Sequence, residues 1–239
     1  MSESKEIQQA KQTGTKSVSN FLQSKAILEK FTSLLGDMAQ GFVTSIITIV
    51  NQSKELQNAT HESIYTAALM AASLDLPINQ NLGFAYIVPY YNKDKVQEAQ
   101  FQMGWKGFVQ LAQRTGLYKN ISASAILEGQ IISNNPLFGY EFDFNIKSDK
   151  VVGYASYFRL LNGFEKVFYM SMEDIQKHAK KYSQTYKSNK DWVVNQSRWS
   201  QDFDSMALKT VIKLLISKFG PMSIEMQKAI ISDQSVIKN

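Results

Sequence analysis

The sequence predicts an α+β fold, an antiparallel sheet with a long packed helix, preceded by an N-terminal helical segment. Three observations lead to this class. Apolar residues recur at helical spacing through residues 24–74, strand-like segments follow one another through residues 83–171, and one long amphipathic stretch fills residues 200–220. No repeat or second linker interrupts this order, so we expect one domain over residues 21–239 after a disordered, basic and polar arm over residues 1–20.

The helical front of this domain, residues 21–75, is predicted to hold three helices. Ser24 can cap the first, which ends at Gly36, and the second carries one apolar face made by Phe42, Ile46, Ile49 and Val50. Thr60 can cap the third, whose inner face is made of small and apolar residues: Ile64, Ala67, Ala68, Ala71 and Ala72. Pro77 prevents further helix.

The core of the domain, residues 83–220, is predicted to begin with a hairpin. "FAYIVPYY" and "VQEAQFQM" flank the polar turn "NKDK", and Pro89 places its strand at an edge or a bulge because proline cannot donate a ladder hydrogen bond. "GWKGFVQLAQRTG" follows as a short helix that ends at Gly116. Four strand segments come next, and the Asn162-Gly163 turn joins the last two; they are "YKNISASAILEG", "FGYEFDFNI", "VVGYASYFRL" and "FEKVFYMS".

The remainder of the chain is predicted to be mostly helical. "SMEDIQKHAKKY" begins after Ser171, with Asp174 three residues later as in a capping box. Residues 183–198 are polar and predict a loop, and "SQDFDSMALKTVIKLLISKFG" predicts a long helix that Gly220-Pro221 ends. "SIEMQKAII" predicts a short final helix within residues 221–239.

Composition excludes several kinds of site. The 239 residues contain no cysteine, which excludes disulfides, thiolate metal sites and a cysteine nucleophile. Two histidines far apart, His61 and His178, make a histidine metal site or a Ser-His-Asp triad improbable, so we expect packing or surface roles for them and no cofactor. The polar N-terminus has no signal core, and the longest apolar run, residues 41–50, is half a membrane span. We therefore expect a cytoplasmic protein with no membrane contact.

Positive charge is concentrated in two parts of the chain. The net charge is +5, carried almost wholly by lysine. Residues 93–119 hold five basic and two acidic residues, and residues 177–218 hold nine basic and three acidic. Between them, residues 120–176 hold four basic and seven acidic residues. This distribution fits an anionic partner.

Each basic block places its charge on a helix face. Lys106, Gln110 and Arg114 lie one turn apart on the short helix, and Lys209 and Lys213 lie one turn apart on the long one. Such stripes can be no more than solvated faces of amphipathic helices. Aromatic residues nevertheless accompany both stripes: Trp105, Trp192, Trp199 and Phe203. Lysines for phosphates and flat rings for bases are what a single-strand-binding surface needs, although at least one tryptophan is expected to pack in the core.

Long collinear motifs then resemble a known family. "NLGFAYIVPY", "AQFQMGWKGFVQLAQRTGLYKNISASAILEGQ", "VVGYASYFRLLNGFEKVFYMSMEDIQKHAKKYS" and "DFDSMALKTVIKLLISKFGPMSIEMQKAI" resemble the RecT family of phage and prophage single-strand annealing proteins, which is distantly related to Redβ. The resemblance runs from about residue 20 to residue 231. It departs from the family pattern at Lys213, where arginine is usual, and little of an acidic tail follows the last motif.

The resemblance implies a function and its partners. Such proteins bind single-stranded DNA and the annealed duplex, form rings or helical filaments, and pair complementary strands without ATP, which fits the lack of a "GxxxxGK[ST]" motif. They act with a 5′-to-3′ exonuclease, and some contact the host single-strand-binding protein. The candidate DNA-binding residues here are Gln102, Trp105, Lys106, Gln110, Arg114, Lys119, Arg198, Phe203, Lys209, Thr210 and Lys213.

We expect distinct roles within this set. Lys106, Arg114, Lys209 and Lys213 are expected to contact phosphates. Gln102 and Gln110 are expected to bond to backbone or sugar. Trp105 and Phe203 are expected to stack or wedge against bases.

Two other functions remain open. A metal-dependent nuclease could use Glu141 and Asp143, or Asp202 and Asp204, although acids near a helix N-terminus are expected in any case. A passive single-strand binder would need the same surface as an annealing protein, and only the resemblance separates the two.

The front helices also predict an assembly. Their apolar residues, Phe42, Ile46, Ile47, Ile49 and Val50, exceed what a compact core obviously needs. We therefore expect part of this surface to pack head-to-tail between subunits, the alternative being that it covers the domain's own core.

Overall fold

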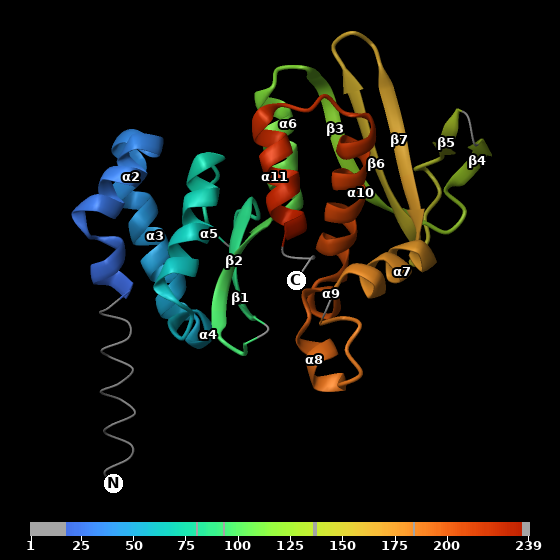
Figure 1. The fold of residues 1–239 in the computed structure, drawn as a ribbon. Helices are drawn as coiled ribbons and strands as arrows, with labels where there is room; N and C mark the ends of the chain where they lie inside the picture. Colours follow the sequence, from blue (N-terminus) through green and yellow to red (C-terminus); the bar gives the residue numbers. More distant parts are fainter. Residues whose placement is uncertain (1–17, 80, 93, 136–137, 184, 236–239) are drawn as a thin grey trace. The chain divides into compact units, whose positions relative to one another are not determined.

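The computed structural model describes residues 18–79, 81–92, 94–135, 138–183 and 185–235. Residues 234 and 235 are described by their backbone alone. Helices and antiparallel strands follow one another as the sequence predicts, so the α+β class with a helical front is confirmed (Figure 1). Contacts divide the chain into two compact units that meet in sequence at Met103 and Gly104. Whether both units fold as the single expected domain stays a prediction.

The first unit contains the three helices that the sequence predicted and two short ones, although Ser24, at the N-cap of the first, makes no side-chain cap hydrogen bond. They are α2 (Lys25–Leu35), the 3-10 turn η1 (Gly36–Met38), α3 (Ala39–Gln52), α4 (Lys54–Gln57) and α5 (His61–Ser73). The Thr60 hydroxyl accepts a hydrogen bond from the Ser63 backbone N–H, which confirms the predicted cap of α5. The short helix α4, capped by Ser53, was not predicted.

The expected disordered arm needs a correction at its end. Residues 1–17 lie outside the described residues, but residues 18–22 are helical. Val18 and Leu22, one turn apart, are 2% and 0% exposed. Burying this apolar pair offsets the entropy of ordering the segment, so residues 18–20 belong to the fold rather than to the arm.

The apolar stretch in the front helices is longer than the sequence suggested. Helical residues Lys25–Gln52 reach a mean hydropathy of 1.4 over their most apolar 18 residues, which by length and composition alone is enough to cross a membrane. A core helix of a soluble protein passes the same test, so this is weak evidence. Ile46, Ile49 and Val50 are in fact buried within the unit, and Phe42 and Ile47 are half-buried. Three of these five residues therefore fill the chain's own core, and the packing of the remaining surface between subunits stays a prediction.

A hairpin completes the first unit. Strands β1 (Ala85–Tyr91) and β2 (Gln97–Met103) pair antiparallel, with Pro89 opposite Ala99. The sheet has two strands, so Pro89 lies in an edge strand as predicted. The Ser63 hydroxyl accepts a hydrogen bond from the Ala99 N–H and so ties α5 to this hairpin.

The second unit is built on a three-stranded antiparallel sheet in the order β3 (Tyr118–Leu127), β6 (Val151–Leu160) and β7 (Glu165–Ser171). Gly163 has φ 90°, a conformation that glycine adopts without strain and that the predicted β6–β7 turn requires. The sequence missed β4 (Ile131–Asn135), which pairs with β5 (Gly139–Phe142) in a separate two-stranded sheet.

Six helices within the described part of the second unit accompany the sheet: α6 (Trp105–Arg114), α7 (Met172–Tyr182), α8 (Asp191–Gln196), α9 (Arg198–Gln201), α10 (Phe203–Phe219) and α11 (Ile224–Ser235). The predicted Ser171 cap of α7 is confirmed, because its hydroxyl accepts from the Asp174 N–H. The predicted loop over residues 183–198 is wrong at its end, since α8 and the start of α9 fall within it. Its serines and asparagines suggest a loop, but Ser197 caps α9 and so starts a helix.

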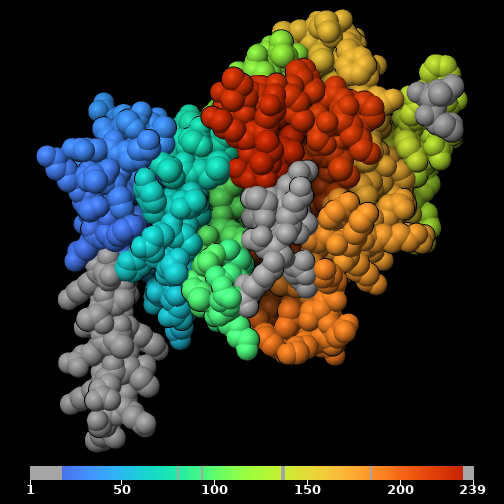
Figure 2. All heavy atoms as spheres, viewed as in Figure 1, coloured from blue at the N-terminus to red at the C-terminus, as the bar shows by residue number. Residues whose placement is uncertain are grey.

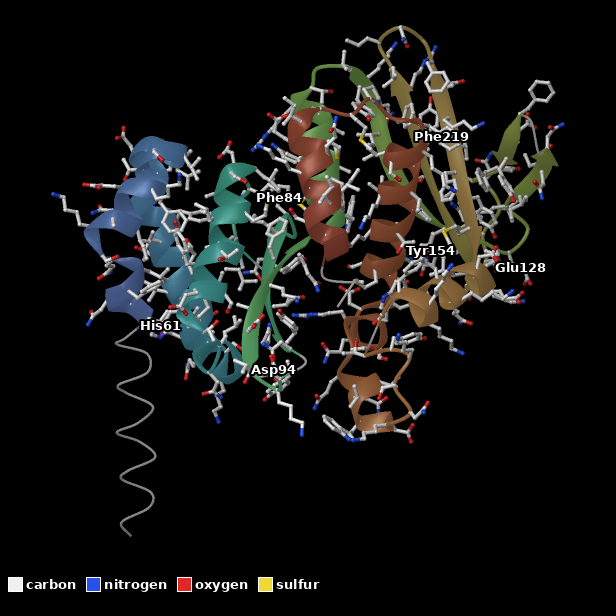
Figure 3. All side chains as sticks on the ribbon, viewed as in Figure 1. His61, Phe84, Asp94, Glu128, Tyr154 and Phe219 are labelled. Carbon is white, nitrogen blue, oxygen red and sulfur yellow. The ribbon has the colours of Figure 1, made fainter. Side chains whose placement is uncertain are left out.

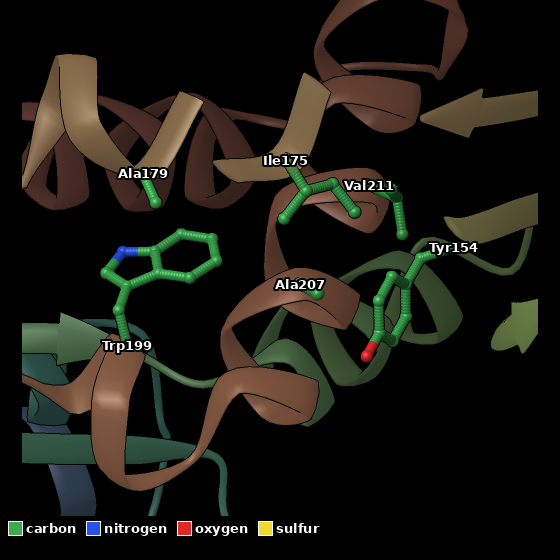
Figure 4. Close-up of a cluster of buried hydrophobic side chains, with 6 residues drawn as sticks. All are labelled: Tyr154, Ile175, Ala179, Trp199, Ala207 and Val211. Carbon is green, nitrogen blue, oxygen red and sulfur yellow. The ribbon is translucent and has the colours of Figure 1, made fainter. Parts of the chain in front are cut away.

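The core of the second unit fixes α10 against β6. A buried cluster joins β6, α7, α9 and α10: Tyr154, Ile175, Ala179, Trp199, Ala207 and Val211 (Figure 4). The buried Ser156 hydroxyl donates to the Val211 carbonyl at 2.8 Å, and the Tyr154 hydroxyl donates to the Asp204 carboxylate. These two bonds set the register of α10 on the sheet.

Candidate nucleic-acid interface

Helix α6 presents the first predicted stripe. Phe108, Leu111 and Ala112 are buried, which turns Lys106 on the opposite side towards solvent. The Lys106 Nζ lies 5.9 Å from the centroid of the half-buried Trp105 ring, a cation–π distance. An exposed cation and a partly open ring therefore stand together at the start of this helix.

The rest of this stripe is partly open. Arg114 is exposed in the last turn of α6, and Gln110 between the two charges is half-buried. Lys119 is exposed in β3, where the pairing with β6 shifts register. Gln102 is half-buried in β2 of the first unit, opposite Tyr86. We name the group of Trp105, Lys106, Gln110, Arg114 and Lys119 the α6 stripe.

Lys209 and Lys213 of helix α10 are nearly buried and ion-paired, unlike Lys106 on α6. The Lys209 Nζ lies 2.7 Å from Asp233 Oδ1, and the Lys213 Nζ lies 2.6 Å from Asp233 Oδ2. The two lysine side chains are 13% and 14% exposed and the Asp233 side chain 4%. The expected solvated face is thus closed in this structure, because a carboxylate from α11 covers it. We name these three residues the α10–α11 triad.

Thr210 does not add an open polar group to α10. Its side chain is buried, and its hydroxyl donates to the Met206 carbonyl one turn earlier. The residue serves the helix itself in this structure. A contact between Thr210 and DNA therefore stays a prediction that needs α10 to be uncovered.

Burial and charge set the protonation of the triad and of a histidine beside it. Burial raises the pKa of the Asp233 carboxyl, but the two ammonium groups outweigh it and hold that pKa below its usual value. Burial lowers the pKa of Lys213, and Asp233 opposes this. Burial and then the charges of Lys213 and Lys181 lower the pKa of His178 on α7 to about 4. His178 is therefore neutral at pH 7, next to a fixed positive charge.

The aromatic residues of the second basic block divide between core and surface. Trp199 is 6% exposed and packs in the buried cluster, which confirms that at least one tryptophan serves the core. Phe203 is half-buried, with its ring 5.5 Å from Trp199 and 6.2 Å from Tyr154. Trp192 is 62% exposed, and Arg198 is exposed. Phe203 is thus held by core rings, while Trp192 is the more open candidate for stacking.

Three lysines that the sequence analysis did not single out lie over aromatic rings. Lys218 Nζ is 4.8 Å from the Phe168 ring and Lys166 Nζ is 5.3 Å from that of Phe219, which Figure 3 labels. Lys181 Nζ is 5.3 Å from the Tyr182 ring. Only the last pair is adjacent in sequence, so sequence spacing could not have revealed the other two.

Three of the four acids that a nuclease would use have structural roles, and the fourth, Glu141, is exposed in β5. Asp202 accepts a hydrogen bond from the Ser205 N–H and caps α10, and Asp204 accepts one from Tyr154. The strand β5 ends at Phe142, so Asp143 lies beyond it and accepts from the Asn145 N–H. Within the described residues, no group of three or more Asp, Glu or His side chains could hold a metal ion.

Asp233 is the residue of this site that sequence reasoning missed. Helical periodicity could have identified it. Met226, Ala229 and Ile230 form the buried face of α11, and Asp233 is the next position on that face. A carboxylate at a core position needs a buried cation. The lysines that supply it stand 24 and 20 positions earlier in the chain.

Most of the sequence is similar to known proteins. The profile of the RecT family matches residues 40–239. The chain is 44% identical over 214 residues to "Uncharacterized protein YqaK" of Bacillus subtilis (strain 168), covering 89% of this chain and 70% of that protein. It is 26% identical over 211 residues to "Protein RecT" of Escherichia coli (strain K12), covering 82% of this chain and 71% of that one. These matches confirm the resemblance that the motifs carried.

Proposed function

Because this chain belongs to the RecT family, we propose that it pairs complementary single strands of DNA during recombination, without ATP and without a covalent step. The protein would bind one strand through its cationic surface and present the bases to a second. Base pairing in the product would drive the reaction, and the protein would supply concentration and alignment. The observation that carries the proposal is the family match over most of the chain.

The α6 stripe supports a role for α6 in holding the strand. It combines an exposed lysine, an exposed arginine and a partly open tryptophan on one short helix. A lysine neutralises a phosphate without reading bases, and a ring stacks on any base. We propose that Lys106, Arg114 and Lys119 contact phosphates, that Trp105 stacks on bases, and that Gln102 and Gln110 bond to backbone or sugar.

We propose a smaller role for Arg198, Phe203 and Trp192. Trp192 is exposed in α8 and Arg198 is exposed in α9, so both can reach a DNA strand without rearrangement. Phe203 is half-buried among core rings, so a base would meet only part of its ring.

The proposed assembly is a homo-oligomer, a ring or a helical filament on DNA. One chain of this size covers few nucleotides, so annealing needs many subunits along the strand. The most exposed apolar side chains of the front helices are Leu34 and Met38, 42% and 62% exposed, and we propose that they take part in the contact between subunits. We propose that the partners are a 5′-to-3′ exonuclease and, where a tail permits it, the host single-strand-binding protein, all in the bacterial cytoplasm.

A sequential gel assay tests the function and its alternatives together. A labelled oligonucleotide is added first and its complement second, without nucleotide or metal and then with Mg²⁺. We expect a shifted complex and then a duplex formed faster than without protein. Binding with no acceleration would instead indicate a passive binder, and shortened products that need Mg²⁺ would indicate a nuclease. A requirement for ATP hydrolysis would contradict the proposed mechanism.

A further inference from the structure

The α10–α11 triad places a protein carboxylate where a DNA phosphate is expected. Lys209 and Lys213 lie one turn apart on α10, and each binds a different oxygen of Asp233. A phosphodiester also presents two anionic oxygens on one centre. It can therefore replace the carboxylate oxygen for oxygen, with the same formal charge.

We propose that Asp233 is a resident substitute for phosphate, and that the last turn of α11 must leave α10 before a strand can occupy Lys209 and Lys213. This inference rests on the proposed function and adds regulation to it. The α6 stripe would take the strand first, and the lysine pair would engage it only after Asp233 withdraws.

The position of Asp233 in its helix favours a reversible contact. The residue lies in the last turn of α11, where the negative end of the helix dipole disfavours a carboxylate. Helix ends are also where a helix opens most readily. The two ammonium groups therefore hold a carboxylate at a place where the helix alone would not stabilise it.

The surroundings of α11 are compatible with its withdrawal. Its buried face is short, consisting of Met226, Ala229, Ile230 and Asp233, while Ile224 and Ile231 are 66% and 64% exposed. The helix packs against α6, and its residues, red in Figure 2, form part of the surface. The last turn can therefore move outward without opening the cluster between α10 and the sheet.

The triad also explains why a lysine pair can be kept buried without DNA. Two ammonium groups with no partner would carry a large desolvation cost, and burial already lowers the pKa of Lys213 despite Asp233. His178 next to them stays neutral and adds no further positive charge. The carboxylate thus keeps a DNA site assembled while it blocks that site.

Binding of a fluorescent oligothymidylate to the full chain tests the proposal. Asp233→Asn keeps the shape and removes the competing charge, and Glu225→Gln makes the same charge change at an exposed position of α11. The apparent dissociation constant varies as the inverse of the fraction of molecules in which the site is open. If the site is open in about a tenth of the molecules, removing the competing carboxylate raises the apparent affinity about tenfold. We expect Asp233→Asn to bind about tenfold more tightly than Glu225→Gln, or better.

The outcomes separate this inference from the proposed function. If wild type binds and the two variants bind equally, Asp233 does not compete and the inference is wrong, while the proposed function stands. If neither wild type nor the variants bind, the proposed function fails and the inference fails with it.

A labelling experiment tests the movement directly. The chain has no cysteine, so Ile230→Cys, one turn before Asp233 and 7% exposed in the native residue, introduces a single thiol. We expect saturating oligothymidylate to increase its labelling rate several-fold, and to leave Ala207→Cys, fully buried on α10, unchanged. If the Ile230→Cys rate stays constant, displacement of α11 is excluded, even if Asp233→Asn binds more tightly.

Discussion

Helices α6 and α10 each carry two basic residues on one face, two turns apart on α6 and one turn apart on α10, yet the two pairs lie in opposite environments. Lys106 on α6 faces solvent beside Trp105. Lys209 and Lys213 on α10 are almost covered and share one carboxylate. Spacing along a helix determines which residues share a face, but a later segment of the chain determines what that face meets. Counting charges in the sequence therefore overestimates the number of cationic side chains that are open to DNA at first contact.

The largest expected effect is on the stability of the protein, which should depend on Lys209 and Lys213 of α10 but not on Lys106 of α6. Lys209→Met with Lys213→Met leaves the Asp233 carboxylate without its two cations. We expect the free energy of unfolding in urea to fall by about 2 kcal/mol, less than the roughly 3–5 kcal/mol of a trapped buried charge because the last turn of α11 can open. Lys106→Met, an exposed site, is expected to change it by at most about 0.5 kcal/mol.

A third variant controls for this experiment. Adding Asp233→Asn to the double lysine variant removes the carboxylate that has lost its two lysines and should restore most of the lost stability. A loss that persists would show that the lysine side chains stabilise α10 by packing. In that case the contrast between the two helices would not depend on the ion pairs.

The pH dependence of stability is the next effect in size. The pKa of His178 is lowered to about 4 in the folded chain and is near 6.5 when unfolded, so the unfolded state binds the proton more readily. This contribution is complete above about pH 6.5 and is lost as the pH falls towards 4. After allowing for partial exposure, we expect about 1 kcal/mol, measured as the difference in unfolding free energy between pH 7.5 and pH 5.

A histidine variant assigns this pH dependence. His178→Gln should reduce the difference in unfolding free energy between the two pH values. His178→Gln with an unchanged pH dependence would assign the effect to other groups. Lys213→Met removes the neighbouring cation and should raise the pKa of His178, which NMR can follow.

Salt dependence distinguishes the helices by their contact with DNA. Lys106→Ala removes one proposed phosphate contact, so the slope of log K against log[salt] should flatten by about 0.7 for single strands. The unfolding free energy should stay unchanged, unlike that of the α10 variant. If the slope of Lys106→Ala equals that of wild type, Lys106 is not in the binding site.

The smallest effect concerns a buried hydroxyl that, unlike the buried charges of the triad, has no hydrogen-bond partner within the described residues. Within the described residues, the Tyr118 hydroxyl is buried with no hydrogen-bond partner, and burial raises the pKa of Tyr118 to about 12. Tyr118→Phe loses no hydrogen bond, so we expect unfolding free energy to stay constant or to rise by up to about 1 kcal/mol. A clear fall in a urea titration would reveal a partner for this hydroxyl.

Local signals in the sequence predicted local structure well. Thr60, Ser171 and the Asn162-Gly163 turn mark element ends because caps and turns depend on residues three or fewer positions away. The strand β4 was missed because its "IISNN" sequence ends in asparagines, which are typical of loops, and only pairing with β5 makes it a strand.

The candidate site was harder to predict, because tertiary packing decides it. Trp192 and Trp199 lie seven residues apart in one basic block, yet one is exposed and the other is buried against α7 and α10. Lys209 and Lys213 were correctly placed on one face, but Asp233 comes from the next helix. Neither composition nor periodicity holds that information.

The two hydrogen bonds between β6 and α10 have a mechanical consequence. Tyr154 holds the first turn of α10 through Asp204, and Ser156 holds its middle through the Val211 carbonyl. The two anchor points are separated by about 10 Å along the helix axis, so they resist both sliding and rotation. When force on a bound DNA strand is transmitted to this unit, α10 should keep its position on the sheet. The strain would then pass to the segment that follows Gly220, which is held to α10 at its far end by the ion pairs of Asp233.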